Sequence, residues 1–172
     1  MTRIQTVCLA LSLLAAPFTA QAASLVFVAT QPPAVAPLSA GAAALLADAC
    51  APAGVFVVPW SQGFYAQERV GQPAAVARLV GAAVAVAVEC ADKAGVTTVR
   101  LQLHEVTGRT VGSFETQGAD PLAALAQALQ ELQKLLAATA PLTAPRWPPT
   151  QSVEALREYA EGVAAAAQPG GA

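Results

Sequence analysis

Charge is scarce in this sequence, and the little that is present is of mixed sign. Charged residues make up 12% of the chain, and nine basic side chains stand against eleven acidic ones, which gives a net charge of −2 at pH 7. No run of Lys or Arg occurs. A surface that follows a nucleic-acid backbone needs clustered basic side chains, because contacts to the phosphates dominate that affinity. The composition therefore excludes nucleic acid as an expected partner.

Enzyme motifs are also missing. The chain has no GxSxG elbow, no GxxxxGK[ST] loop, no CxxC pair and no GxGxxG after its first expected strand. Its only histidine, His104, excludes a metal site built from several histidines. We therefore predict no catalytic residue, no cofactor and no metal, and a protein that is not an enzyme.

Three polar residues, His104, Glu89 and Asp92, are candidates for isolated sites. His104 occupies an outward position on an expected strand, and Glu105 points to the opposite face, so no acid supports the imidazole. Glu89 and Asp92 flank Cys90 at a strand end. A solvated hairpin explains them better than a cation site, because calcium takes about six or more oxygen ligands.

No hydrophobic run at the amino terminus is long enough to span a bilayer. Arg3 precedes an apolar run from Val7 to Ala16, and Ala20–Gln21–Ala22 has the pattern of a signal-peptide cleavage site. We predict that residues 1–23 are a cleavable signal peptide, and the alternative is a retained membrane anchor. Cys8 would leave with the peptide. The mature chain is then expected in the periplasm and is not an integral membrane protein.

Strand-like and helix-like segments alternate in the rest of the chain. Ser24–Thr30 (SLVFVAT) is a β-branched and aromatic run, typical of a strand that is covered on both faces. The next expected elements are a helix over Leu38–Cys50, a strand over Val55–Trp60, a polar loop over Ser61–Gln72 and a helix over Pro73–Val80.

The stretch GAAVAVAVECAD, residues 81–92, predicts a buried central strand. Alanine and valine alternate from Ala83 to Val88, which is the period of a strand and not of a helix. A membrane helix would need about 20 apolar residues. The elements expected next are a turn over Asp92–Gly95, strands over Val96–Val106 and Arg109–Thr116, and a helix from Asp120–Pro121 to about Ala138.

The resulting order, β-α-β-α-β-β-β-α, predicts an α/β layered sandwich with a mixed five-stranded sheet over residues 24–138. Residues 139–151 contain four prolines and are expected to be a stiff linker. Residues 152–172 are expected to form a helix capped by Ser152, followed by a frayed tail.

Aromatic and apolar side chains near the second strand and in the C-terminal region form the candidate partner surface, because exposed aromatics often anchor protein interfaces. For Trp147 there is an alternative, in which this side chain folds back onto the domain and closes its edge. The candidate residues are Trp60, Phe64, Tyr65, Trp147, Leu156 and Tyr159.

The whole pattern resembles the amino-terminal domain of the periplasmic protein TolB and related modules that precede tetratricopeptide repeats. The segments that carry the resemblance are SLVFVAT, VFVVPW and above all LVGAAVAVAVE…VRLQLHEVTGRTVGSF, followed by a leucine-rich helix. This resemblance implies an α/β sandwich like that of anticodon-binding domains, which works through protein contacts and has no catalytic residue to carry over. SVEALREYAEG resembles the start of a repeat segment. TolB's propeller is absent, and the repeats stop after one helix.

The resemblance also bears on Cys50 and Cys90. Two cysteines in an oxidising compartment favour a disulfide. If the third strand runs parallel to the first, however, Cys90 lies at its carboxyl end and Cys50 at the opposite end of the sheet. A strand of eight residues spans ~26 Å, while a disulfide needs Cα atoms within about 7 Å. The pair is therefore a candidate disulfide with one argument on each side.

Three functions compete at this point. The leading one is a non-enzymatic periplasmic adaptor that contacts another envelope protein. The second is a small secreted enzyme with its site at the carboxyl ends of the parallel strands, near Gln31, Ser61 and Gln62, where open α/β sheets bind ligands. The third is a remnant of a longer repeat protein.

Overall fold

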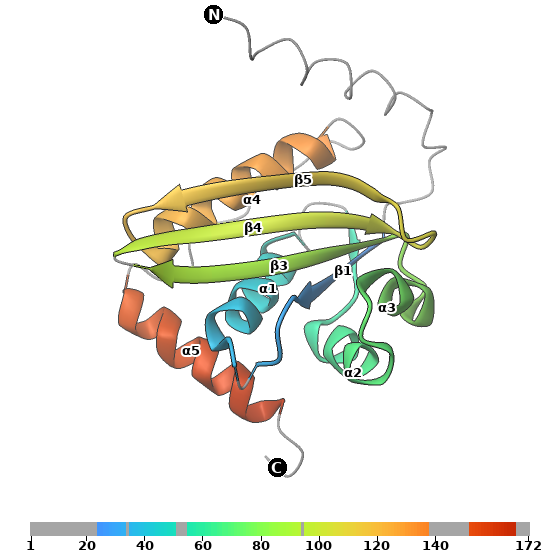
Figure 1. Cartoon of the computed structure of the whole chain (residues 1–172), viewed down its shortest axis with the longest axis horizontal. Helices are drawn as coiled ribbons and strands as arrows, with labels where there is room; N and C mark the ends of the chain where they lie inside the picture. The colour runs from blue at the N-terminus through green and yellow to red at the C-terminus, as the bar shows by residue number, and fades with distance from the viewer. Residues whose placement is uncertain (1–23, 34, 51–54, 94, 138–151, 168–172) are drawn as a thin grey trace, which may run out of the picture.

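A computed structural model describes residues 24–33, 35–50, 55–93, 95–137 and 152–167 of the chain. These residues form five strands and five helices, shown in Figure 1. The strands are β1 (Ser24–Ala29), β2 (Phe56–Val57), β3 (Val84–Lys93), β4 (Val96–Glu105) and β5 (Thr110–Gly118). The helices are α1 (Pro37–Cys50), α2 (Trp60–Val70), α3 (Pro73–Val80), α4 (Pro121–Ala137) and α5 (Val153–Ala166).

The strands make one mixed sheet in the order β2-β1-β3-β4-β5. β1 runs parallel to both β2 and β3, whereas β3, β4 and β5 form an antiparallel meander. This confirms the predicted α/β class and the predicted mixed sheet of five strands. A register shift interrupts the β4–β5 pairing between Leu103 and His104.

The alternation in β3 places valine and alanine on different faces, as predicted. Val84, Val86 and Val88 join the core beneath α1 and α4, while Ala85 and Ala87 join a second core beneath α2 and α3. Small alanine side chains let helices approach that face closely. The strand is longer than predicted, because pairing continues to Lys93–Val96 and only Gly95, at φ 76°, lies in the described part of the turn.

The region after β2 differs most from the sequence prediction. Only Phe56–Val57 pair as a strand, and Trp60–Val70 is a helix where a polar loop was expected. The helix begins at Trp60, and Pro59 is its N-cap residue, with φ −51° and an extended ψ of 136°. Gly63 sits where α2 crosses β1, since a Cβ there would lie 2.8 Å from Cγ2 of Val26. A glycine in the middle of a helix weakens the helix signal in the sequence, which is why the helix was missed.

The helices cover the two faces of the sheet unequally. α1 and α4 pack on one face of the whole sheet, and α5 packs on the far side of α1. α2 and α3 cover the other face mainly over β1 and β3, and α3 also contacts β4. Figure 1 shows β4 and β5 with no described helix in front of them. Among the described residues, no helix has both the length and the apolarity needed to cross a bilayer.

α1 is buried on nearly every side. Its residues from Ser39 to Cys50 are all buried except Asp48. The helix lies between the sheet and α5, and Gly41 marks the crossing point with α5. A Cβ at Gly41 would lie 2.6 Å from the Cβ of Ala160. The C-terminal helix is therefore packed onto the domain, and its Leu156 belongs to the main core.

Candidate binding surface

The predicted aromatic surface does not assemble in the structure. Trp60 and Phe64 have ring centroids 6.2 Å apart, and Phe64 and Tyr65 have centroids 5.7 Å apart. Phe64 is nevertheless only 6% exposed, because it lies on the inner side of α2. Trp60 is half-buried against the core, and Tyr65 alone is open, at 62%. Phe64 must therefore be removed from the candidate surface.

The C-terminal members of the set are also separated from it. Leu156 is 2% exposed, since it inserts into the core under α1, and it too must be removed. Tyr159 is 39% exposed on α5. Tyr65 lies on α2, which packs on β1 and α3, whereas Tyr159 lies on α5, which packs on α1 and α4. Trp147 and the linker lie outside the described residues.

A different surface is formed by the outward face of β3, β4 and β5. Glu89, Arg100 and Glu115 stand directly opposite one another on these strands. Arg100 Nη1 lies 3.2 Å from Oε2 of Glu89, and Arg100 Nη2 lies 2.7 Å from Oε2 of Glu115. Arg100 Nε also donates to Glu115, at 3.0 Å, and Gln117 donates to the other oxygen of that carboxylate at 3.3 Å.

We call Glu89, Arg100 and Glu115 the charge row. Hydrogen bonding and charge attraction from Glu115 raise the pKa of Arg100, and the hydrogen bond from Arg100 lowers the pKa of Glu115. Glu115 is therefore held as a carboxylate at neutral pH. Since these groups are exposed, the row contributes little to folding stability. Its value is an ordered arrangement of charge on an open sheet face.

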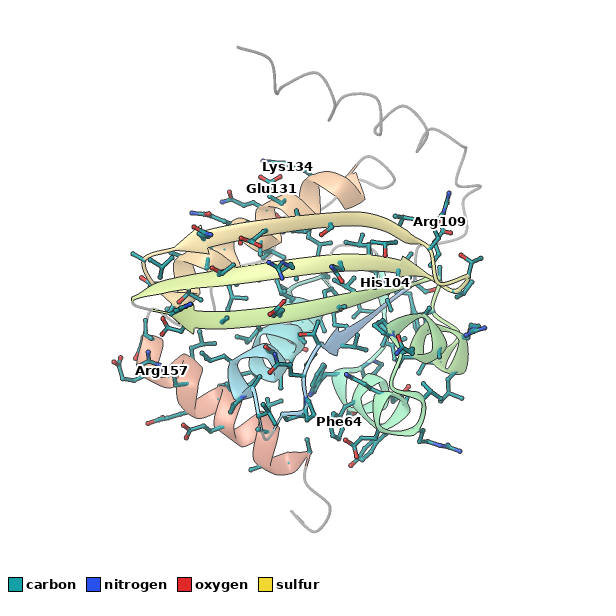
Figure 2. All side chains as sticks on the ribbon, in the orientation of Figure 1. Phe64, His104, Arg109, Glu131, Lys134 and Arg157 are labelled. Carbon is teal, nitrogen blue, oxygen red and sulfur yellow. The ribbon has the colours of Figure 1, made fainter. Side chains whose placement is uncertain are left out.

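The other end of this sheet region carries the histidine. His104 Nδ1 lies 3.2 Å from Oγ1 of Thr110 on β5. Glu105 faces away from it and bonds Arg109, at 2.8 Å, which lowers the pKa of Glu105. Figure 2 shows His104 and Arg109 near the β4–β5 hairpin, with Arg157 at the opposite end of the sheet. Glu105 thus pairs with Arg109 and not with His104.

The acids around Cys90 are both paired with arginines. Glu89 bonds Arg100, and Oδ2 of Asp92 lies 3.4 Å from Nη2 of Arg157 on α5. A solvated hairpin was expected for these two acids. In the structure both lie within β3. Within the described ranges, no three His, Cys, Asp or Glu side chains come together in a way that could hold a metal ion.

Cys50 and Cys90 are free, buried thiols. The backbone N–H of Cys90 donates to Oγ of Ser39, at 3.0 Å, and that hydroxyl lies 3.3 Å from the carbonyl oxygen of Cys90. Cys90 therefore lies beside the start of α1. Cys50 comes eleven residues later, from 39 to 50, at the end of the same helix. A helix rises ~1.5 Å per residue, which separates the two cysteines by about 16 Å, far beyond the reach of a disulfide.

The residues of the alternative enzyme site are Gln31, Ser61 and Gln62. All three are exposed, and none of them titrates near neutral pH. His104 pairs with Ala85 near the amino end of β3, so it lies at the other end of the sheet from these residues. Among the described residues, no hydrogen bond or ion pair joins these three side chains to a titratable group.

Comparisons with known proteins give one distant structural similarity. No protein-family model matches the sequence, and no curated protein matches it. Among solved structures, the chain is similar to the LpoB C-terminal domain from Salmonella enterica, with a TM-score of 0.43 and 17% identity. The alignment covers 64% of this chain and 93% of that domain. A likeness this distant carries no inference about family or function.

Proposed function

We propose that this chain is a non-enzymatic adaptor of the bacterial cell envelope, which acts by holding another envelope protein. The observation that carries the proposal is the open outward face of β4 and β5, with the charge row spanning the strands. A folded domain has no need to order three charged side chains across an uncovered sheet for stability alone, because exposed ion pairs stabilise folding weakly. Ordered polar groups on an open face are suited to recognising a partner.

The envelope location rests on the amino-terminal pattern. Arg3, the short apolar run and Ala20–Gln21–Ala22 support export. Cleavage after Ala22 would leave β1 whole, since that strand begins at Ser24 and the hydroxyl of Ser24 accepts a hydrogen bond from the N–H of Ala83. Mass spectrometry of the mature chain tests this part. We expect a start at Ala23 or Ser24, and an intact Met1 would contradict export by cleavage.

The adaptor proposal is tested by site-specific photocrosslinking in intact cells. A photoreactive residue at Gln102, an outward position of β4 between Arg100 and His104, is expected to trap a partner. The matched control carries the same residue at Glu158, which is exposed on α5. Crosslinks from Gln102 but not from Glu158 are the expected result. Absence of any crosslinked protein from the open face, including positions Arg100 and Ser113, would contradict the adaptor function.

A further inference from the structure

The two edge strands of the sheet differ in length: β2 is short and β5 is long. An unpaired edge offers a row of free N–H and C=O groups, and proteins usually blunt it by shortness, proline or lysine. The edge strand β2 is only two residues long. The opposite edge strand, β5, has nine residues, TVGSFETQG, which include neither proline nor lysine, and no strand of the described residues pairs with its outer side. Its register shift lies close to the hairpin and leaves Ser113 to Gly118 in regular pairing.

The pairing of β4 with β5 indicates which main-chain groups face the free edge. The N–H of Glu105 donates to the carbonyl of Arg109, at 2.9 Å. Hydrogen-bonded and non-hydrogen-bonded pairs alternate along an antiparallel ladder. Counting from this bond across the bulge makes Leu101–Phe114 and Val99–Thr116 hydrogen-bonded pairs. The residues whose main-chain groups then point away from β4 are Ser113, Glu115 and Gln117.

The charge row ends at this edge on an acid. Glu89, Arg100 and Glu115 alternate in sign across β3, β4 and β5, and a base on a sixth strand would continue the alternation. Glu115 is the only charged residue of β5. A second copy of this chain, pairing through its own β5, would bring no base to face Glu115. The charge pattern therefore favours a different protein over self-association.

We propose that the free edge of β5 binds an extended segment of the partner protein as a sixth strand, with Lys or Arg placed opposite Glu115. The inference rests on the adaptor function and names the part of the molecule that would carry it out. Main-chain hydrogen bonds supply affinity in this mode of recognition, and the side chain that meets Glu115 supplies selectivity.

Two synthetic peptides serve as probes of the mature chain. The first, Ser-Val-Thr-Val-Lys-Val-Thr-Val-Ser, alternates apolar and polar residues around a central lysine, and the second has glutamate in place of the lysine. An opposite charge directly across a strand pair is favourable by about 0.2–1 kcal/mol, and a like charge is unfavourable by a similar amount. We therefore expect the lysine peptide to bind roughly fivefold more tightly, with the difference shrinking as salt is added.

Two variants separate the strand contact from the charge contact. Ser113→Pro removes an N–H at the free edge, where proline is tolerated, and is expected to abolish binding of both peptides. Glu115→Gln is expected to keep binding but to make the two peptides equal. Glu158→Gln, on α5, is the control and should preserve the fivefold preference. Circular dichroism and the urea midpoint establish that each variant is folded.

Several outcomes would overturn the inference. These are failure of the native chain to bind either peptide, equal binding of both, or unchanged binding by folded Ser113→Pro. Concentration-dependent dimers that Ser113→Pro abolishes would assign the edge to a second copy instead. A crosslinked envelope partner that survives Ser113→Pro would refute the edge contact and leave the adaptor function standing. Absence of any partner would refute the adaptor function itself.

Discussion

At the scale of single residues, the hydroxyl of Ser39 forms the hydrogen bonds to Cys90 that a neighbouring strand would otherwise form. β1 pairs with β3 only as far as Ala29–Val88, with one further bond from the N–H of Thr30 to the carbonyl of Val88. Beyond that point β1 no longer supplies hydrogen-bond partners for the N–H and C=O of Cys90. The hydroxyl of Ser39, at the start of α1, lies within hydrogen-bond distance of both groups. One buried side chain thus ties the first helix to the central strand.

Ser39→Ala should therefore destabilise the domain. The change leaves two buried main-chain groups unsatisfied, which costs about 1–3 kcal/mol. Urea unfolding followed by circular dichroism measures the loss as a lower midpoint. Ser61→Ala is the matched control, because Ser61 is exposed on α2 and its loss should change stability by less than about 0.5 kcal/mol. Equal midpoints for the two variants would show that the Ser39 contacts contribute nothing.

Thr97, unlike Ser39, has a buried hydroxyl that forms no hydrogen bond within the described residues. Its side chain is 1% exposed. Thr97→Val removes an unpaired buried hydroxyl and keeps the shape, so we expect stability to rise by about 1 kcal/mol. Thr116→Val, one strand away, should instead lower stability by about 1 kcal/mol, because the hydroxyl of Thr116 donates to the carbonyl of Ala124 at 3.0 Å. Destabilisation by both changes would indicate that Thr97 has a bound water.

At the scale of elements, α5 depends on one close approach to α1. The gap at Gly41 is too small for a side chain, since a Cβ would meet the Cβ and Cα of Ala160 at 2.6 and 2.8 Å. Gly41→Ala is expected to push α5 outward and to cost about 1–3 kcal/mol, despite the better helix propensity of alanine. Hydrogen exchange should accelerate in residues 153–166 before it does so in the sheet.

Gly162→Ala makes the same chemical change where there is room for it. Apart from the neighbouring backbone of α5 itself, no atom of the described residues lies within 4 Å of a Cβ built at Gly162. Alanine there should stabilise the chain by about 0.5–1 kcal/mol through helix propensity alone. The two glycines therefore predict effects of opposite sign. Protection of α5 in Gly41→Ala at the native level would mean that this helix does not rest on the Gly41 contact.

A helix or strand could be predicted where the pattern that identifies it lies within its own residues, and not where it depends on contacts with other elements. The Ala–Val alternation of residues 83–88 identifies β3, because this period is visible within the segment itself. Asp120–Pro121 likewise identifies the start of α4, where Oδ1 of Asp120 accepts from the N–H of Ala123 at 2.8 Å. α2 was missed because Gly63 serves a tertiary contact with β1 and weakens the local pattern. The burial of Leu156 was missed for a similar reason, since α1 supplies its neighbours.

The sequence of α1 contains a feature that predicts the packing of α5 against it. PLSAGAAALLADAC is apolar around its whole circumference, and a helix of that kind needs cover on more than one side. The sheet supplies one side, so a further helix was required to cover the other. The charge row could not be predicted from a local sequence pattern. Its three members come from strands up to 26 positions apart, from Glu89 to Glu115, and only the pairing register brings them together.

At the scale of the whole molecule, the fold keeps two thiols apart in a chain expected to be exported. Cys50 and Cys90 lie at opposite ends of α1, 1% and 6% exposed. Burial raises the pKa of each thiol to about 12, with the charge of Asp92 adding to the effect at Cys90. Both therefore remain protonated at neutral pH, and the thiolate is the reactive form.

We expect the mature chain, purified from an oxidising compartment, to contain two free thiols that a thiol reagent does not label while the protein is folded. Unfolding in urea should expose both, so that labelling rises from none to two per chain. The raised pKa values predict that this protection persists up to about pH 9, since neither thiol has begun to ionise there. A disulfide-linked peptide pair containing residues 50 and 90, or a mass two hydrogens lower, would contradict the arrangement. It would require α1 to leave the sheet, because the helix rises about 16 Å between Ser39, which lies beside Cys90, and Cys50.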